Sequence, residues 1–293
     1  MHKGQQIRVG KTELAVTGRF FRTARLRHEW FEFLENPPAM VKRIQQGPPV
    51  ADVFTFLQEV QNGHSDYQFH KEMDGAAVLK VTTREEWWKN LDFKVRNKAR
   101  KAQKSGVELR PAELTDDFVR GVESIYNESP LRQRKKFWHY GKGFAQIKED
   151  LSSFPDCTFF IGAYHRDELI GFVKLFQGND ILRTVHIIAK LSHRDKPVQD
   201  ALIAKAVAAC EERKISRLHY GDWSRGGLGA FKIKHGFERV DFTRYFVPLT
   251  TWGKLLLQLN LHHPIEDRLP ERWIRNLTAL RAKWNSLRYG AAR

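Results

Sequence analysis

The chain has 293 residues, of which 41% are hydrophobic and 12% aromatic, and this composition excludes a disordered or fibrous protein. Its two cysteines, Cys157 and Cys210, exclude a disulfide framework and a zinc site built on thiolates, so we expect a reduced, cytoplasmic protein. The formal charge of +16 is either a solvated positive surface or the binding surface for an anionic partner such as nucleic acid, lipid headgroups or a phosphorylated small molecule.

Residues 1–83 are predicted to form a small mixed α/β unit. Alternating apolar residues and turn-forming pairs predict strands, and prolines are expected to interrupt helices. The expected elements are a β-hairpin over 7–26, helical segments over 28–44 divided at Pro37-Pro38, a strand over 53–57, and a second hairpin over 67–81 that turns at Asp74-Gly75.

A basic helix is predicted next. Thr82 and Thr83 precede Glu85 and Glu86 by three residues, the spacing of a capping box, and Gly106 is expected to end the helix. Apolar residues recur every three or four positions along it and form one stripe. The basic residues around the rest of this helix are Lys94, Arg96, Lys98, Arg100, Lys101 and Lys104. They are either a solvated face or a set of phosphate contacts.

The central region has the clearest pattern, with the order strand, strand, strand, helix, strand, helix, strand. A short strand over 107–110 and a helix over 115–126 precede it. The first three strands should form an antiparallel meander, since short turns join them. The expected elements are strands over 158–164, 169–177 and 181–191, a helix over 198–214, a strand over 218–220, a helix over 228–235 and a strand over 237–249.

This order resembles the acyl-CoA N-acyltransferase fold of the GNAT superfamily. The resemblance rests on the meander at 157–191 with the helix that follows, and on the run GGLGAFKIKHGFERV at 226–240, where Gly236-Phe237 closes the last helix as in the family. The stretch WWKNLDFKVRNKARKAQKSGVELRP at 87–111 looks like the start of the second domain of Fem-type ligases, two-domain relatives that use aminoacyl-tRNA as donor.

The resemblance implies an α/β (α+β) fold with a GNAT-like mixed sheet and flanking helices over 84–249. Residues 1–83 would be a smaller, degenerate related domain. The resemblance also implies a V-shaped split between the strand over 181–191 and the strand at Leu218. Ligands of open α/β sheets collect at such a position. Independently of the resemblance, Trp and Leu residues at helical spacing in 250–293 predict a helical tail that packs on the core or, as the alternative, lies on a membrane surface.

The donor site implied by the resemblance follows the third meander strand. GNAT enzymes usually have a glycine-rich turn there, whose backbone N–H groups hold a pyrophosphate. Residues 191–197 contain no glycine, so side-chain cations would have to replace those contacts, unless the loop is only solvated. The candidate donor-binding residues are Ser192, His193, Arg194, Lys196, Val198 and Phe231.

Acyl transfer also needs a path for a proton and a site for the acceptor. Asp222, after the strand that contains Tyr220, either accepts the proton or caps a turn. His186 in the third meander strand either faces the cleft or lies in the core. These three residues are the catalytic candidates. The acceptor candidates form a polar, aromatic and basic segment that is otherwise a surface loop: Tyr126, Glu128, Arg132, Arg134, Trp138 and Tyr140.

The sequence lacks the motifs that several classes of enzyme require. No GxxxxGK[ST], GxSxG or HExxH motif occurs, so a phosphate-binding loop, a serine hydrolase and zincin chemistry are excluded and no catalytic metal is expected. No apolar run approaches the roughly 18 residues of a membrane span, and the N-terminus has no signal-type segment.

The predicted function is an N-acyltransferase that moves an acyl group from an acyl-CoA, such as acetyl-CoA, to an amine. It would act in a ternary complex through proximity and carbonyl polarisation. Two alternatives stay open: a Fem-type transferase with aminoacyl-tRNA as donor, and a non-catalytic protein that binds nucleic acid.

Overall fold

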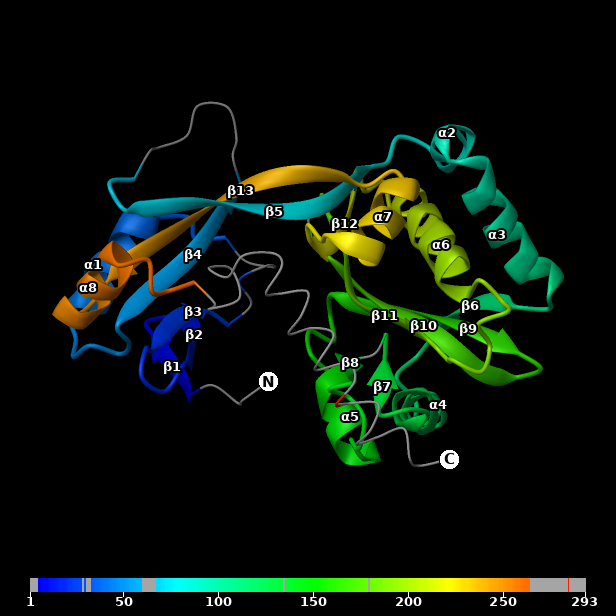
Figure 1. Cartoon of the computed structure of the whole chain (residues 1–293), viewed down its shortest axis with the longest axis horizontal. Coiled ribbons are helices and arrows are strands. Elements are labelled where there is room, and N and C mark those ends of the chain that lie inside the picture. Colours follow the sequence, from blue (N-terminus) through cyan, green and yellow to red (C-terminus); the bar gives the residue numbers. More distant parts are fainter. Residues whose placement is uncertain are drawn as a thin grey trace. The chain divides into compact units, whose positions relative to one another are not determined.

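A computed structural model describes residues 5–263, except 28, 30–32, 60–66, 134 and 179, and also residue 284 (Figure 1). The contacts divide the chain into two compact units. Unit 1 comprises Met1–Gly75 and Asp241–Ile274, and unit 2 comprises Ala76–Val240 with a final segment, Arg275–Arg293. The units are therefore interleaved along the chain, whereas the limits predicted from the sequence are consecutive. The pairing of β13 (Glu238–Pro248) with β4 (Val53–Glu59) is the physical reason.

Unit 1 contains a mixed sheet with the strand order β1-β2-β3-β4-β13. The first three strands pair antiparallel, β3 pairs parallel with β4, and β4 pairs antiparallel with β13. A buried cluster that includes Phe54, Phe56 and Tyr245 packs against α1. The other elements of unit 1 are β1 (Gln5–Val9), β2 (Thr12–Thr17), β3 (Thr23–Leu26), α1 (Pro37–Gln45) and α8 (Thr251–Gln258).

The prediction of a hairpin at Asp74-Gly75 is wrong, because β5 (His70–Lys80) runs through this pair as one strand. The Asp74 carboxylate accepts hydrogen bonds from Nε and Nη2 of Arg244 at 3.0 and 2.9 Å, so its polarity serves an ion pair and not a turn. The predicted division of the stretch 28–44 at Pro37-Pro38 coincides with the start of a helix, and residues 28 and 30–32 before it lie outside the described residues. Both prolines lie in the first turn of α1, where a missing N–H costs nothing, and Asn36 caps that turn.

Unit 2 contains the predicted meander within a sheet of order β5-β12-β11-β10-β9-β6. All neighbouring strands pair antiparallel except β11 and β12, which are parallel. Two further short strands, β7 (Leu131–Arg132) and β8 (Lys135–Lys136), pair with each other. The sheet strands are β6 (Glu108–Ala112), β9 (Thr158–His165), β10 (Glu168–Gln177), β11 (Leu182–Ala189) and β12 (Arg217–Asp222).

Helices cover both faces of this sheet (Figure 1). On one face α2 (Arg84–Asn90), α3 (Phe93–Lys104) and α6 (Val198–Glu212) share a buried cluster with the strands. On the other face α4 (Asp116–Asn127) and α5 (Phe144–Leu151) form a second cluster around Phe118 and Phe172. The last helix of unit 2, α7 (Gly226–Lys234), follows β12. The mixed α/β fold predicted from the sequence is confirmed.

The predicted helix over 85–105 is two helices. Thr83 caps α2 by accepting the N–H of Glu86 at 3.1 Å, as the capping-box spacing predicts. The chain then becomes extended at Leu91, which is buried, and Asp92 begins α3 by accepting the N–H of Lys94 at 2.6 Å. A second capping residue inside the apolar stripe therefore breaks the helix without removing its buried face.

Candidate active site

The predicted split lies between β11 and β12. The two strands pair only at Leu182 with Leu218 and at Arg183 with His219. Beyond this point β11 carries an extra residue, since the register to β10 shifts between the partners of Thr184 and His186. Such a bulge bends a strand and turns it away from its neighbour. The backbone between the two strands therefore opens toward the carboxyl end of the parallel pair.

Two cavities meet at this split. The first, of 680 Å³, is bounded by β11, β12 and α7, and we call it the β12 cavity. The second, of 710 Å³, is bounded by β11, the loop 191–197 and the start of α6, and we call it the α6 cavity. Gln133, His186, Ile187 and Gln199 line both. The two cavities thus share one wall, and a long ligand could extend from one into the other.

The cavities bring together many of the predicted site residues. Asp222, Tyr220, Phe231 and His186 line the β12 cavity. The residues that line the α6 cavity are His186, His193, Arg194, Lys196, Val198 and Arg132. The residues that line neither cavity are Ser192, Tyr126, Glu128, Trp138 and Tyr140, and Arg134 lies outside the described residues.

The two exposed aromatics of the predicted acceptor segment lie apart from the cavities. Trp138 and Tyr140 are 56% and 47% exposed, and the ammonium of Lys142 lies 4.5 Å from the Trp138 ring centroid. They are available to a large ligand, but not to a small one that is confined to the two cavities.

His186 is neutral at physiological pH. Burial lowers its pKa to about 4, and the charges of Lys142 and Arg132 act in the same direction. Its ring stacks on Phe172, and its Nε2 lies 3.5 Å from the Tyr126 hydroxyl, a distance at the limit of a hydrogen bond. The structure therefore gives His186 both of the predicted features, a packed ring and a place in the cavity wall.

Lys232 is the functional candidate that the sequence analysis missed. Its side chain is 2% exposed and lines the β12 cavity. The ammonium donates to the carbonyl of Asp222 at 2.7 Å and to Oγ of Ser224 at 3.0 Å. Burial lowers its pKa, and the Asp222 carboxylate partly opposes this. These oxygens accept two of its three N–H groups, and the ammonium also lies 4.9 Å from the centroid of the Tyr220 ring in the same cavity wall.

Hydropathy predicts that Lys232 is exposed, but α7 buries this lysine and exposes its apolar neighbours. Ile233 is 58% exposed and Leu228 is 43% exposed. Apolar periodicity would predict that the isoleucine and leucine face the core and that the lysine faces solvent. The sequence carries no signal for this inversion, since it becomes visible only when the exposure of each residue of α7 is known.

The loop 191–197 is held by a carboxylate. Glu128 accepts the backbone N–H of Leu191 at 2.5 Å and that of Ser192 at 2.7 Å. Burial raises the pKa of Glu128, but the hydrogen bonds from Ser192 and Leu191 and the charge of Arg132 outweigh this and lower it. An acidic side chain thus occupies backbone donors that a pyrophosphate would need.

Three further backbone donors of this segment are also engaged. The N–H groups of Arg194, Lys196 and Val198 donate to loop carbonyls at 3.3, 3.0 and 2.7 Å. Pro197, the residue before α6, has no N–H. Few backbone donors of the loop are therefore left for an anion, and side chains and the first turn of α6 are the other groups that could bind one.

Five cations line the α6 cavity: Lys98, Arg132, Lys190, Arg194 and Lys196. Three have acidic partners, since Lys190 contacts Glu168, Lys196 contacts Asp195 and Arg132 contacts Glu128. Lys98 and Arg194 have no acidic partner among the described residues. Because Lys98 belongs to α3, the positive surface of that helix continues into the cavity.

The buried histidines make the fold sensitive to acid. Burial lowers the pKa of His186 to about 4, that of His219 to about 3 and that of His139 to about 2. An unfolded histidine titrates near 6.5, so the unfolded state binds more protons below that pH. We expect the free energy of unfolding to fall as the pH drops from about 6.5 toward 4, by up to about 1.4 kcal/mol per pH unit for each histidine.

Urea unfolding at several pH values measures this dependence. The variant His186→Gln should flatten the slope by about one proton, since one titrating group is gone. An unchanged slope in that variant would show that His186 is not neutral in the folded state.

The meander, the splayed parallel pair β11–β12 and the helix that begins at its open end form a GNAT-like fold. Among solved structures, the C-terminal domain (DUF2156) of a protein assigned as a lysylphosphatidylglycerol synthetase from Agrobacterium fabrum is similar, with a TM-score of 0.59, 10% identity and 87% of each chain covered. FemX is similar with a TM-score of 0.57 and 11% identity, over 87% of this chain and 90% of that one.

A third similar structure is L-PGS from Bacillus licheniformis, with a TM-score of 0.55, 13% identity and coverage of 83% of this chain and 84% of that one. No family model matches the chain, and no curated protein matches it by sequence. Within the described residues, none of the helices combines the length and the apolar character needed to cross a bilayer.

Proposed function

We propose that this protein is an aminoacyltransferase that takes an amino acid from the ester bond of an aminoacyl-tRNA and transfers it to an amine. The observation that carries the proposal is the α6 cavity: five cations line it, while the Glu128 carboxylate occupies backbone donors of the adjoining loop. This combination suits the distributed charge of a nucleic acid better than a compact pyrophosphate. The similarity to FemX supports the fold on which such transfer would occur.

The two cavities have separate roles in this proposal. Lys98 and Arg194 bind phosphates of the tRNA acceptor end in the α6 cavity. The aminoacyl ester extends past His186 into the β12 cavity, where its carbonyl oxygen approaches the Lys232 ammonium. That ammonium stabilises the negative charge that develops on the oxygen during attack.

The transfer step exchanges the ester bond for an amide bond. The acceptor amine forms a C–N bond to the carbonyl carbon, and the C–O bond to the tRNA ribose breaks. The leaving ribose oxygen takes up a proton, and the amine loses one. Asp222 lies at the end of β12 in the wall of the same cavity and accepts the amine proton directly or through water.

Acyl-CoA is the second candidate donor. The first turn of α6 begins at the α6 cavity, and Gln199 of that turn lines the cavity wall, so the helix N-terminus could still bind a phosphate. The acceptor in either case is an amine.

Titrations of the full chain with bulk tRNA and, separately, with acetyl-CoA over a range of salt concentrations test the proposal. We expect saturable tRNA binding that weakens steeply as salt rises, because counterions are released. Binding of acetyl-CoA at moderate salt without tRNA binding would overturn it in favour of the second candidate. If the chain binds neither tRNA nor acetyl-CoA, both candidate donors are contradicted.

The loop cations should contribute to donor binding without stabilising the fold. In the double variant Arg194→Ala, Lys196→Ala we expect tRNA binding to weaken by about tenfold or more. The melting temperature should stay within about 2 °C, since Arg194 is exposed and the ion pair of Lys196 is a local one with its neighbour Asp195. The matched control replaces Lys135 and Lys136, both exposed on β8, by alanine. Equal weakening in both double variants would show a nonspecific charge effect.

A further inference from the structure

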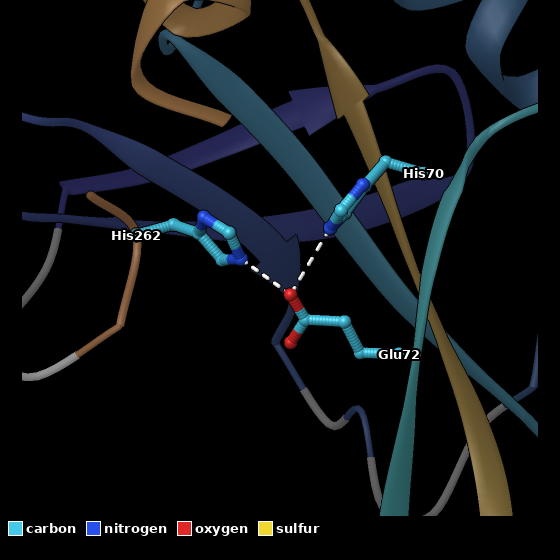
Figure 2. A group of neighbouring side chains, drawn as sticks. All are labelled: His70, Glu72 and His262. Atoms are coloured by element: carbon cyan, nitrogen blue, oxygen red, sulfur yellow. Dashed lines mark hydrogen bonds and ion pairs between the residues drawn. The ribbon is translucent and has the colours of Figure 1, made fainter. Parts of the chain in front are cut away.

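Three histidines surround one carboxylate oxygen in unit 1. The Nε2 atoms of His262, His70 and His263 lie 2.5, 3.0 and 3.0 Å from Oε1 of Glu72. Figure 2 shows the imidazoles of His70 and His262 directed at the Glu72 carboxylate. The ligand atoms of His70, Glu72 and His262 all lie within 4.8 Å of one another.

Ordinary hydrogen bonding does not satisfy this arrangement. A carboxylate oxygen has two lone pairs, so it cannot accept good hydrogen bonds from three imidazoles at once. If the imidazoles were protonated, their charges would repel, since the rings of His262 and His263 are 4.2 Å apart and those of His70 and His262 are 5.5 Å apart. A divalent cation among these atoms would use the lone pairs of neutral imidazoles and remove both difficulties.

The elements that hold the cluster are well defined. His70 and Glu72 alternate along β5 and so point to the same side of the strand. His262 follows the end of α8, and its side chain is 2% exposed and packs against Phe246. Its Nε2 lies 2.5 Å from Oε1 of Glu72, so Nε2 is the nitrogen that is placed to bind.

We propose that His70, Glu72 and His262 bind a divalent transition metal, with Zn²⁺ as the expected ion, and that water completes the coordination. Two imidazoles and one carboxylate are a ligand set that suits Zn²⁺ at bond lengths of about 2.0–2.2 Å. A tetrahedral site needs ligand atoms roughly 3.3 Å apart, so His262 and Glu72 would separate slightly on binding. The metal would join the segment after α8 to β5, which lie 190 positions apart.

Zinc binding by the untagged full chain tests this site. The chain is stripped with a chelator, dialysed, and titrated with ZnCl₂ against a chromogenic competitor. We expect one Zn²⁺ per chain and a higher melting temperature with zinc, because the ion binds the folded state. Co²⁺ in place of Zn²⁺ should give the visible absorption of a four-coordinate site.

Variants separate the three ligands from their neighbour. Glu72→Gln preserves the side-chain shape, and it and His262→Ala should each weaken zinc binding by about 100-fold or more. The matched control His263→Ala removes an adjacent imidazole and should change the affinity by less than about threefold. Absence of stoichiometric zinc binding by the wild type overturns the proposal, as does retention of tight binding in Glu72→Gln. Equal losses in His262→Ala and His263→Ala overturn the three-ligand assignment.

Discussion

Replacement of Lys232 by methionine is expected to slow aminoacyl transfer by about 100- to 1,000-fold, the usual cost of removing one preorganised donor to a developing oxyanion. Methionine fills a similar volume but cannot donate to the substrate carbonyl. The rate at which the protein discharges bulk aminoacyl-tRNA in the presence of a simple amine measures the effect. Binding of tRNA should change little, because the Lys232 ammonium lies in the β12 cavity and not among the cations of the α6 cavity.

The control for this experiment is Lys234→Met, two positions along α7 on the exposed side of the helix. This variant has the same change in charge and should retain the rate of the wild type. If Lys232→Met and Lys234→Met discharge aminoacyl-tRNA equally fast, Lys232 has no part in the chemistry. A large loss of tRNA binding in Lys232→Met would instead assign it to donor binding.

Reversal of two charges on α3 should have the next largest effect. In Lys98→Glu, Lys101→Glu we expect tRNA affinity to fall by about 10- to 100-fold. The plot of log affinity against log salt should become shallower by about two, one unit for each lost phosphate contact. Both side chains are exposed, and Lys98 lines the α6 cavity, so the fold should not be affected. Filter binding or fluorescence anisotropy at several salt concentrations measures both quantities.

Unit 1 offers a control double variant with the same change in net charge as the α3 variant. Lys42 and Lys254 are exposed on α1 and α8, and their replacement by glutamate changes the total charge by the same amount. If both double variants lose the same affinity, the +16 charge of the chain acts as a whole and α3 is not a specific binding surface. Loss confined to the α3 variant supports direct phosphate contacts.

Local signals in the sequence predict the elements that are fixed by local physics. The caps at Thr83 and Thr115 accept backbone N–H groups as expected. Gly106 and Gly236 end their helices with φ values of 75° and 85°, a conformation that favours glycine. The meander follows from short turns between apolar strands. These features need only neighbouring residues, so periodicity and capping rules identify them.

Contacts between distant positions of the chain explain the features that the sequence did not predict. Asp74-Gly75 has the composition of a turn, but the ion pair with Arg244, 170 positions away, places Asp74 in a continuous strand. Two cysteines are too few for a metal site built on thiolates, whereas the His70, Glu72 and His262 cluster forms only when the end of α8 packs beside β5.

The sequence also did not predict where two side chains of the candidate site point. The sequence places Glu128 in the acceptor segment, and the structure shows that it holds the loop 191–197 instead. Lys232 looks like one more cation of a basic helix until its burial is known. Both residues take their environment from a different element, and hydropathy along one segment does not reveal that environment.

The interleaved connectivity of the two units sets the order in which the chain can fold during synthesis. The strand that pairs with β4 is β13, and it leaves the ribosome only after the whole of residues 76–240. Until then β4 presents a long, hydrophobic edge with unpaired backbone groups, the kind of edge that promotes aggregation. A nascent chain stalled before residue 241 would carry this open edge, so the yield of soluble protein depends on β13 being made and paired with β4 promptly.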